Sequence, residues 1–310
     1  MTFTYYKDKN YPSVGKWLLI NVLGDGATST VFLGYDLKTK SYSAIKIFKD
    51  TDPFTAAQAK KEALLHSSIN HRLILQVKEF NSASQLVDLA GNKKSVSFME
   101  LELARGGDLL LLLERVKFVP EKLARTYFHQ IIEVLEYLHQ KKIAHGDIKP
   151  ENLMLDSNFC IKLADFGSAS KLTSNSFQVS EAGTTKYFPP ERYQERNYDG
   201  ASADIFAAAI VLFCLVCGQM PFSKAVRTDY LYYLISNGKV DLFWMAHQEI
   251  AEKRRIHINP SPEFKDLLAG LMDPDPKRRY SIDNIKKSPW YQCSIYEPTE
   301  VMQLVQKMID

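Results

Sequence analysis

The sequence predicts an α+β chain built as two lobes, and three observations support this prediction. At 310 residues the chain exceeds the size of about 250 to 300 residues at which a single hydrophobic core stops growing, so two lobes with a cleft between them are expected. Short strand-like runs fill the first third of the chain, whereas longer helical patterns dominate the rest. We therefore expect a small β-rich lobe with one main helix and a larger α-helical lobe.

Two glycines follow the first strand-like run, Leu18 to Leu23. Gly24 and Gly26 are typical of a hairpin with a flexible tip, and their backbone N–H groups can approach phosphate oxygens. A Gly-x-Gly hairpin on its own is more often a plain turn. The phosphate-binding interpretation therefore depends on the residues that follow.

The next strand-like run, residues 43–48, sets Lys46 between apolar neighbours, and a buried lysine needs an anion. Sixteen positions later, Glu62 lies in a segment, residues 54–67, whose composition favours a helix. Lys46 and Glu62 are candidates for an ion pair. The alternative is that both are ordinary exposed charges, which is the interpretation we give to the adjacent lysines.

Further elements follow from pattern. Residues 85–89 and 95–103 are strand-like and flank Gly91-Asn92, a typical hairpin turn. Residues 120–140 carry apolar side chains at steps of three or four, which predicts a helix. Residues 205–217 are wholly apolar but shorter than the roughly 20 residues of a membrane span, so they predict a buried core helix.

Composition excludes several classes of function. The formal net charge of +3, from 39 basic and 36 acidic side chains, is too balanced for a nucleic-acid-binding face. Residues 1–10 lack the apolar core of a signal peptide, so we expect a cytoplasmic protein, with the nucleus as a further location. Cys214 and Cys217 lie within the apolar run, and we interpret them as packing residues, with neither a metal nor a disulfide.

The segment from His145 to Asn152 carries the chemistry. Transfer of a γ-phosphoryl group needs a carboxylate near the attacking hydroxyl, a cation for the moving phosphate and ligands for a metal ion. Asp147, Lys149 and Asn152 are these three types, and Asp165 follows thirteen residues later as a second metal carboxylate. Taken alone, Asp165-Phe166-Gly167 fits a solvated turn as well as it fits a metal site. The order of the two motifs, residues 145–152 and then 165–167, favours phosphoryl transfer.

These motifs resemble those of the eukaryotic protein kinase family, whose catalytic loop reads His-Arg-Asp-x-Lys-x-x-Asn and whose magnesium site reads Asp-Phe-Gly. The resemblance implies a bilobal protein kinase fold and a Ser/Thr kinase, with motifs most similar to the calcium/calmodulin-dependent group. It also implies the domain limits: an N-terminal lead over residues 1–13, a kinase domain over 14–293 with lobes 14–103 and 104–293, and an amphipathic helix over 294–310.

The resemblance also implies ATP and Mg²⁺ as cofactors and assigns roles by position. Lys46, paired with Glu62, holds the α and β phosphates; Asp147 is the base, Lys149 steadies the γ-phosphate, and Asn152 and Asp165 bind metal. The remaining nucleotide-binding positions are in the glycine hairpin, the strands and the hinge: Leu23, Gly24, Gly26, Val31, Ala44, Leu101, Glu102, Ala104 and Met154. Ser29 replaces the third glycine of the family's loop.

Protein substrates are implied by a segment that resembles the family's activation segment and ends in Pro189-Pro190-Glu191. By resemblance, Glu191 pairs with Arg279, and Asp204 is expected to act as a helix N-cap that also bonds the catalytic-loop backbone.

Four residues bear on the substrate. Lys149 and Thr184 favour Ser/Thr acceptors. Asp108 and Glu151 match family carboxylates that contact a basic residue upstream of the target hydroxyl. Cys214 stands where strongly basophilic members carry a further carboxylate, so we expect a limited basic preference.

Gly146 departs from the family pattern, because most relatives carry an arginine there that grips a phosphate on the activation segment. A charge-assisted hydrogen bond contributes about 1.5 to 3 kcal/mol, and a glycine cannot supply one. We hypothesise that activity depends little on activation-segment phosphorylation, because the loop is already ordered or is set by a regulatory partner. Lys171 is an alternative source of the missing cation.

Two further alternatives stay open. Residues 297–310 place apolar side chains on one helical face, which favours docking on the larger lobe over binding a partner; the segment is too acidic for a calmodulin target. We expect a monomer.

An ATP-binding pseudokinase that acts as a scaffold is the rival to an active enzyme. Only Ser29 and Gly146 favour this alternative, and neither departure removes a reacting group.

Overall fold

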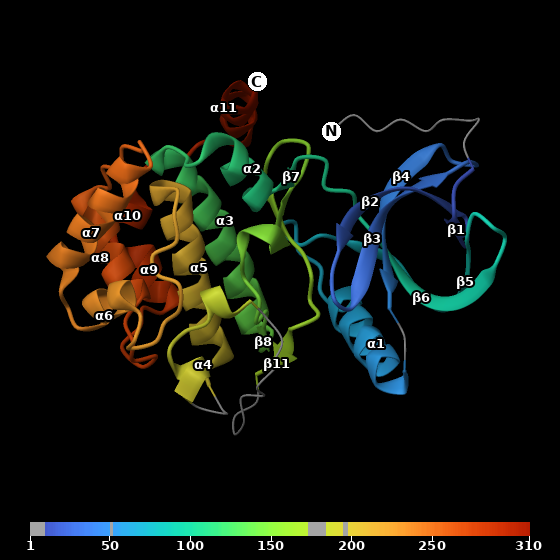
Figure 1. Cartoon of the computed structure of the whole chain (residues 1–310), viewed down its shortest axis with the longest axis horizontal. Coiled ribbons are helices and arrows are strands. Elements are labelled where there is room, and N and C mark those ends of the chain that lie inside the picture. The colour runs from blue at the N-terminus through green and yellow to red at the C-terminus, as the bar shows by residue number, and fades with distance from the viewer. Residues whose placement is uncertain (1–9, 50–51, 173–183, 195–197) are drawn as a thin grey trace. The chain divides into compact units, whose positions relative to one another are not determined.

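The computed structural model describes residues 10–49, 52–172, 184–194 and 198–310, and the chain divides into two compact units, Met1–Arg105 and Gly106–Asp310. The first unit is a β-structure with one helix, and the second is mainly helical (Figure 1). The expected α+β arrangement is therefore present. Residues 1–9 of the predicted N-terminal lead lie outside the described residues.

Six antiparallel strands close the first unit into a barrel in the order β1-β2-β3-β4-β6-β5. Their bounds are β1 Ser13–Val14, β2 Trp17–Asp25, β3 Ser29–Asp36, β4 Ser41–Phe48, β5 Val77–Val87 and β6 Lys93–Leu101. The short strand β1 pairs with both β2 and β5, and closure leaves no free sheet edge. The predicted β5–β6 hairpin is confirmed, although β5 begins earlier and β6 ends sooner than the patterns suggested.

The barrel core follows from the alternation of side chains along each strand. Its buried members are Val14, Trp17, Leu19, Ile45, Ile47, Val96 and Phe98. The single helix of this unit, α1 (Pro53–Ser67), begins at a capping box in which the Asp52 carboxylate accepts from the backbone N–H groups of Phe54 and Thr55. This helix packs against β5 and β6, which fixes the position of Glu62 in the unit.

The second unit combines helices with two small sheets, of order β10-β9-β7 and β11-β8. Its elements are β7 Gly107–Asp108, α2 Leu109–Val116, α3 Glu121–Gln140, β8 Ile143–Ala144, η1 Pro150–Asn152, β9 Leu153–Leu155, β10 Ile161–Leu163, β11 Ser170–Lys171, η2 Thr185–Tyr187, α4 Glu191–Gln194, α5 Gly200–Cys217, α6 Tyr230–Ser236, α7 Val240–Lys253, α8 Pro262–Leu271, α9 Ile282–Lys287, α10 Pro289–Gln292 and α11 Pro298–Ile309. The predicted helix over 120–140 is α3, and its apolar stripe is fully buried.

Helix α5 is the core of this unit. It is the one helix among the described residues that is long and apolar enough to cross a membrane by length and composition, yet 83% of its 18-residue window is buried inside the fold. This confirms a buried core helix. All four cysteines are free, and Cys214 and Cys217 are buried within α5, so the packing interpretation is also confirmed.

The predicted start of this helix is wrong. Asp199 is the N-cap, and its side chain accepts from the N–H groups of Ala201 and Ser202. Asp204 therefore lies inside α5, about one turn after its start. The apolar pattern begins only after Asp204 because the first turn consists of small residues that do not reveal their helical conformation.

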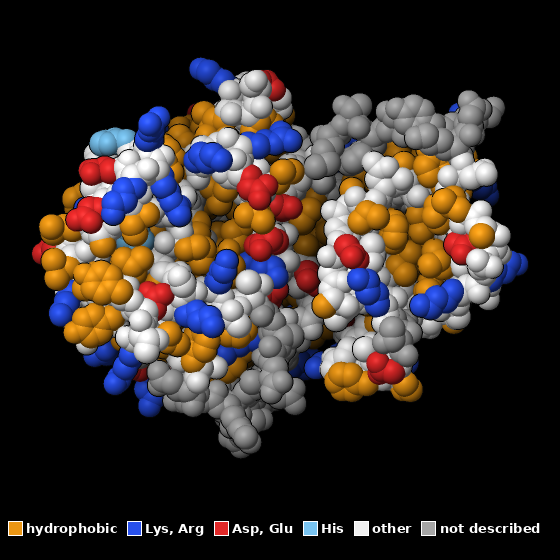
Figure 2. Space-filling view, in the orientation of Figure 1, with side chains coloured by type: hydrophobic (Ala, Val, Ile, Leu, Met, Phe, Trp, Pro, Cys, Tyr) orange, Lys and Arg blue, Asp and Glu red, His pale blue; other side chains and the backbone are white. Residues whose placement is uncertain are grey.

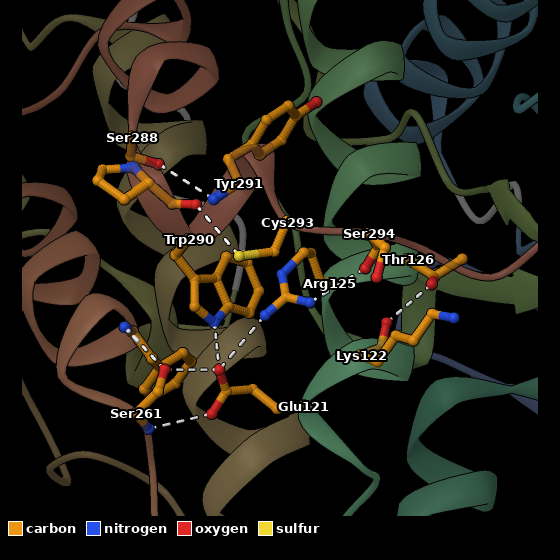
Figure 3. A network of polar contacts seen from close by, with 12 residues as sticks. Glu121, Lys122, Arg125, Thr126, Ser261, Ser288, Trp290, Tyr291, Cys293 and Ser294 are labelled. Carbon is orange, nitrogen blue, oxygen red and sulfur yellow. Dashed lines mark hydrogen bonds and ion pairs between the residues drawn. The ribbon is translucent and has the colours of Figure 1, made fainter.

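A partly buried polar network ties the C-terminal part of the unit to the start of α3 (Figure 3). One carboxylate oxygen of Glu121 accepts from Trp290 Nε1 at 2.6 Å and from Ser261 Oγ at 2.7 Å. Arg125 lies over the Trp290 ring, 4.6 Å from its centroid, and donates to the carbonyl of Ser294 at 3.1 Å. These contacts hold α8 and α10 on α3.

The C-terminal helix α11 docks on the second unit. Val301 and Val305 are fully buried, and the helix packs against α2. Docking, the favoured of the two alternatives, is therefore confirmed. Apolar side chains also show on the visible face over α6 and α7 (Figure 2), where Tyr230, Tyr233 and Met245 are exposed.

Candidate active site

Asp147 lies in the loop between β8 and η1, and three residues contact its carboxylate. Its Oδ2 lies 2.7 Å from Lys149 Nζ and accepts from Asn152 Nδ2 at 3.1 Å. Its Oδ1 accepts from the backbone N–H of Thr184 at 3.0 Å. Only 9% of the side chain is exposed, so these bonds fix the carboxylate in one orientation. A cation, an amide and a backbone N–H thus surround one acidic group, as phosphoryl transfer requires.

Asp204 binds the backbone of this loop through hydrogen bonds. Its carboxylate accepts from the N–H groups of His145 at 2.9 Å and Gly146 at 2.8 Å, and from His139 Nε2 at 3.0 Å. The side chain is 1% exposed. The predicted bond from Asp204 to the loop is confirmed, although its predicted place as an N-cap is not. Because Asp204 lies in α5, its hydrogen bonds connect the loop to the core of this unit.

Asn152 and Asp165 fit the role of metal ligands. Strands β9 and β10 pair antiparallel; Asn152 directly precedes β9, and Asp165 follows β10 by two residues. Ala164 N donates to Asn152 O at 2.9 Å. Asn152 Nδ2 donates to the carbonyl oxygen of Asp147 at 2.8 Å and to its Oδ2 at 3.1 Å, which directs the amide oxygen to the other side. No cluster of three or more His, Cys, Asp or Glu residues forms a metal site within the described ranges. One carboxylate and one amide suit Mg²⁺ that also binds substrate phosphates.

Asp165 has an unusual backbone conformation, with φ of +61°. Such a conformation is uncommon for a residue with a side chain, and strain of this kind concentrates at functional sites. The adjacent Phe166 is 1% exposed and packs edge-on against His145, with 4.9 Å between ring centroids. The imidazole of His145 in turn bonds the Ala164 carbonyl at 3.0 Å. The two motifs recognised in the sequence therefore form one packed group.

The first unit holds its own set of predicted residues. Lys46 on β4 and Glu62 on α1 form an ion pair, with 2.5 Å between Nζ and Oε1. Both side chains are 7% exposed, which excludes the alternative of ordinary surface charges. Lys46 Nζ also lies 5.5 Å from the Phe48 ring centroid. The neighbours Lys60 and Lys61 are exposed, as expected.

Strand register places four predicted nucleotide-binding residues on one face of the barrel sheet. Val31 pairs with Lys46, and Ala44 pairs with Leu101. Directly paired residues share a face, as do residues two apart on a strand. Gly24 pairs with Val31 at the end of β2. An apolar face with a lysine at one edge and a glycine at the other suits an aromatic ring joined to phosphates.

The tip of the glycine hairpin carries a network that the sequence did not predict. Lys49 Nζ pairs with Asp25 Oδ1 at 2.9 Å and donates to the Gly26 carbonyl at 2.7 Å. Thr30 Oγ1 donates to the same Asp25 oxygen at 2.6 Å, and these bonds lower the pKa of the exposed Asp25 carboxyl. The hairpin is therefore tied to the end of β4.

The remaining predicted nucleotide-binding positions lie at the ends of these strands or in the second unit. Leu23 is exposed on β2, and Met154 is half-buried on β9. Glu102 and Ala104 follow β6 as half-buried residues, and Glu102 N donates to the Gln76 carbonyl at 2.8 Å. Of these, Met154 is the one that lies beside the catalytic loop.

The predicted substrate carboxylates both lie in the second unit. Asp108 is the N-cap of α2, where its Oδ1 accepts from Leu111 N at 2.8 Å, and burial raises its pKa. Within the described residues, Glu151 Oε2 is buried without a hydrogen-bond partner, a situation that costs free energy unless a donor arrives. Lys149 Nζ donates to Thr184 Oγ1 at 2.9 Å, so Thr184 belongs to the same network as Asp147.

The predicted pair of Glu191 and Arg279 is confirmed. The guanidinium donates to both carboxylate oxygens, at 2.6 and 2.9 Å, and its side chain is fully buried. Nε also donates to the Asp273 carbonyl at 3.1 Å. This bidentate pair anchors the end of the predicted activation segment. Residues 173–183 of that segment lie outside the described residues.

Gly146 has a φ of +79°, which favours glycine. A Cβ atom at this position would lie 2.8 Å from the Ser168 carbonyl oxygen, so a side chain here would strain the loop in two ways. Lys171, the alternative cation, lines a small cavity together with Gly146 and Ser168. The glycine is thus fitted to this backbone.

The fold defines a protein kinase, together with the Lys46–Glu62 pair of the first unit and the network around Asp147 in the second unit. The protein kinase domain family matches residues 17–291, so the chain belongs to this family and has its bilobal fold.

Among similar proteins are CBL-interacting protein kinase 26 of Oryza sativa subsp. japonica, 34% identical over 278 residues, and CBL-interacting serine/threonine-protein kinase 16 of Arabidopsis thaliana, 30% identical over 289 residues. These alignments cover 88% and 89% of this chain but 51% and 57% of the relatives. The chain therefore spans about half the length of these relatives.

Proposed function

We propose that the protein is a Ser/Thr protein kinase that transfers the γ-phosphate of Mg-ATP to protein substrates. The observation that carries this proposal is the network around Asp147, in which Lys149, Asn152 and Thr184 all contact one carboxylate or each other. The buried pair of Lys46 and Glu62 supplies the nucleotide-positioning group of the other unit.

Asp147 orients the substrate hydroxyl and accepts its proton as the hydroxyl oxygen attacks the γ-phosphorus. Lys149 lies close enough to Asp147 to stabilise negative charge on the transferred group. Lys46, held by Glu62, binds the α and β phosphates. The Asn152 amide oxygen and the Asp165 carboxylate would hold Mg²⁺, which when bound neutralises charge on the phosphates.

The substrate is a protein with a serine or threonine acceptor and basic residues upstream of it. The unpartnered Glu151 oxygen and the half-buried Asp108 carboxylate support this preference. Cys214, a neutral and buried residue, limits it. Because burial raises the pKa of Asp108, the preference for basic residues weakens on acidification at a higher pH than an ordinary carboxyl would allow.

Regulation is proposed to come from a partner protein more than from phosphorylation. The similar proteins are named as CBL-interacting kinases, which supports a regulatory partner here. We further propose a monomer in the cytoplasm or nucleus with the kinase domain at 14–293. Because Gly146 has no side-chain cation to bind a phosphate, phosphatase treatment should leave activity within a few-fold, and a loss of more than tenfold would contradict this.

Transfer from Mg-ATP to a degenerate peptide library tests the activity and reports sequence preference together. Asp147→Asn keeps the size of the side chain but removes the proton acceptor, so we expect a loss of about 10² to 10⁴-fold. Asp241→Asn, at an exposed position in α7, is the matched control and should retain full activity. A pseudokinase scaffold would instead bind ATP without transfer, and undiminished transfer by Asp147→Asn would refute the role of Asp147.

A further inference from the structure

Arg192 lies where no sequence pattern predicted a functional group. It is the second residue of α4, and its guanidinium stacks on the Phe188 ring, with 3.5 Å from Cζ to the ring centroid. Tyr198 lies on the same guanidinium at 5.3 Å. Nη1 donates to the carbonyl oxygen of Gly146 at 3.1 Å. Arg192 thus connects the segment after Thr184 to the residue that immediately precedes Asp147.

The surroundings of Arg192 are those of the catalytic loop. Arg192, Asp147, Thr184 and Asp204 line one small cavity. Burial lowers the pKa of the guanidinium, whereas Tyr198, Asp147 and Asp204 act in the opposite direction. An arginine stays protonated under such opposing influences. A fixed positive charge therefore accompanies the proposed catalytic carboxylate.

The segment that Arg192 fastens is itself ordered by local bonds. Tyr187 N donates to the Thr184 carbonyl at 3.0 Å, and Phe188 N donates to the Thr185 carbonyl at 3.1 Å. The Tyr193 hydroxyl donates to the Thr185 carbonyl at 2.6 Å. Residues 184–193, which comprise η2 and the start of α4, are therefore linked by local hydrogen bonds, and we expect a shift of Arg192 to move Thr184 with it.

We propose that Arg192 is a positioning residue that holds residues 184–193 against the catalytic loop and so keeps Thr184 on Asp147. This inference rests on the proposed kinase function and names the group that makes the loop independent of phosphate. Gly146 contributes only its carbonyl oxygen to the contact with Arg192. The cation is the Arg192 guanidinium, which lies at the C-terminal end of residues 184–193. Because the cation belongs to the chain, the contact needs no modification to form.

Arg192→Gln removes the charge and the planar stacking group, Arg192→Lys keeps the charge alone, and Arg115→Gln, at the exposed end of α2, is the matched control. A charge-assisted hydrogen bond with a stacked guanidinium contributes about tenfold or more to an equilibrium. For Arg192→Gln we expect peptide kcat/KM to fall at least tenfold and the KM for ATP to stay within twofold. Arg192→Lys should fall between Arg192→Gln and the wild type. Peptide kcat/KM within twofold of the control in both Arg192 variants would overturn the proposal.

Hydrogen exchange gives a second readout that does not require activity. The N–H groups of Thr184, Tyr187 and Phe188 are hydrogen-bonded, and in Arg192→Gln they should exchange at least tenfold faster, while amides of α3 stay unchanged. Unchanged protection at these three amides would overturn the proposal even if the wild-type protein transferred no phosphate. A wild type without transfer refutes the proposed function, whereas an active wild type with unaffected Arg192 variants refutes only this inference.

Discussion

The pair of Glu191 and Arg279 offers a prediction whose magnitude follows directly from the structure. Arg279 donates from both terminal nitrogens to Glu191, and it also bonds Ser202 and the Asp273 carbonyl. Glu191 is 5% exposed. Arg279→Met would leave the Glu191 carboxylate buried without its cation, which costs about 3–5 kcal/mol in the free energy of unfolding.

A double-mutant cycle separates the pair from its surroundings. Glu191→Gln keeps the shape of the side chain and leaves Arg279 with a neutral acceptor, so we expect a loss of about 1–3 kcal/mol. The double variant Glu191→Gln with Arg279→Met buries no unpaired charge and should lose less than the sum of the two single variants.

Urea unfolding followed by circular dichroism measures each free energy of unfolding. Arg278→Met removes a neighbouring arginine that is 67% exposed and should stay within about 0.5 kcal/mol of the wild type. The reasoning is refuted if Arg279→Met loses less than about 1 kcal/mol, or if the two single losses simply add.

Three other perturbations have expected outcomes. Lys46→Met should weaken ATP binding at least tenfold in a fluorescence titration, whereas Lys61→Met, at an exposed position, should leave it unchanged. Gly146→Ala should lose more thermal stability than Gly238→Ala, because both have a positive φ but only the first would place a Cβ against another atom. Burial lowers the pKa of His247 to about 4, below about 6.5 when unfolded, so stability measured by urea unfolding should fall by about 3 kcal/mol as pH drops from 6.5 to 4, and His247→Gln should remove this dependence.

Much of the fold and of the proposed site was predictable because its signals are local. Asp147, Lys149 and Asn152 lie within six positions of one loop, so their proximity follows from the chain itself. The pair of Lys46 and Glu62 was predictable because a lysine between apolar strand residues needs an anion. The packing stripe of α3 follows from helical periodicity.

What could not be predicted depends on distant parts of the chain. The first turn of α5 lacks large apolar residues, so pattern placed the helix start at Asp204 and missed the cap at Asp199. Arg192 follows a glutamate, and two adjacent charged residues are typical of an exposed segment. No local pattern predicts that its guanidinium reaches Gly146, 46 positions away. The link between Lys49 and Gly26 likewise exists only once β2, β3 and β4 have paired.

The most direct test of the central claim is the single-turnover rate at which the γ-phosphate moves from Mg-ATP to a serine peptide with upstream basic residues. The account predicts measurable transfer by the phosphatase-treated wild type, a fall of at least 10²-fold in Asp147→Asn, and unchanged ATP affinity in that variant. Equal rates in the two proteins, or no transfer by a wild type that binds Mg-ATP, would contradict it.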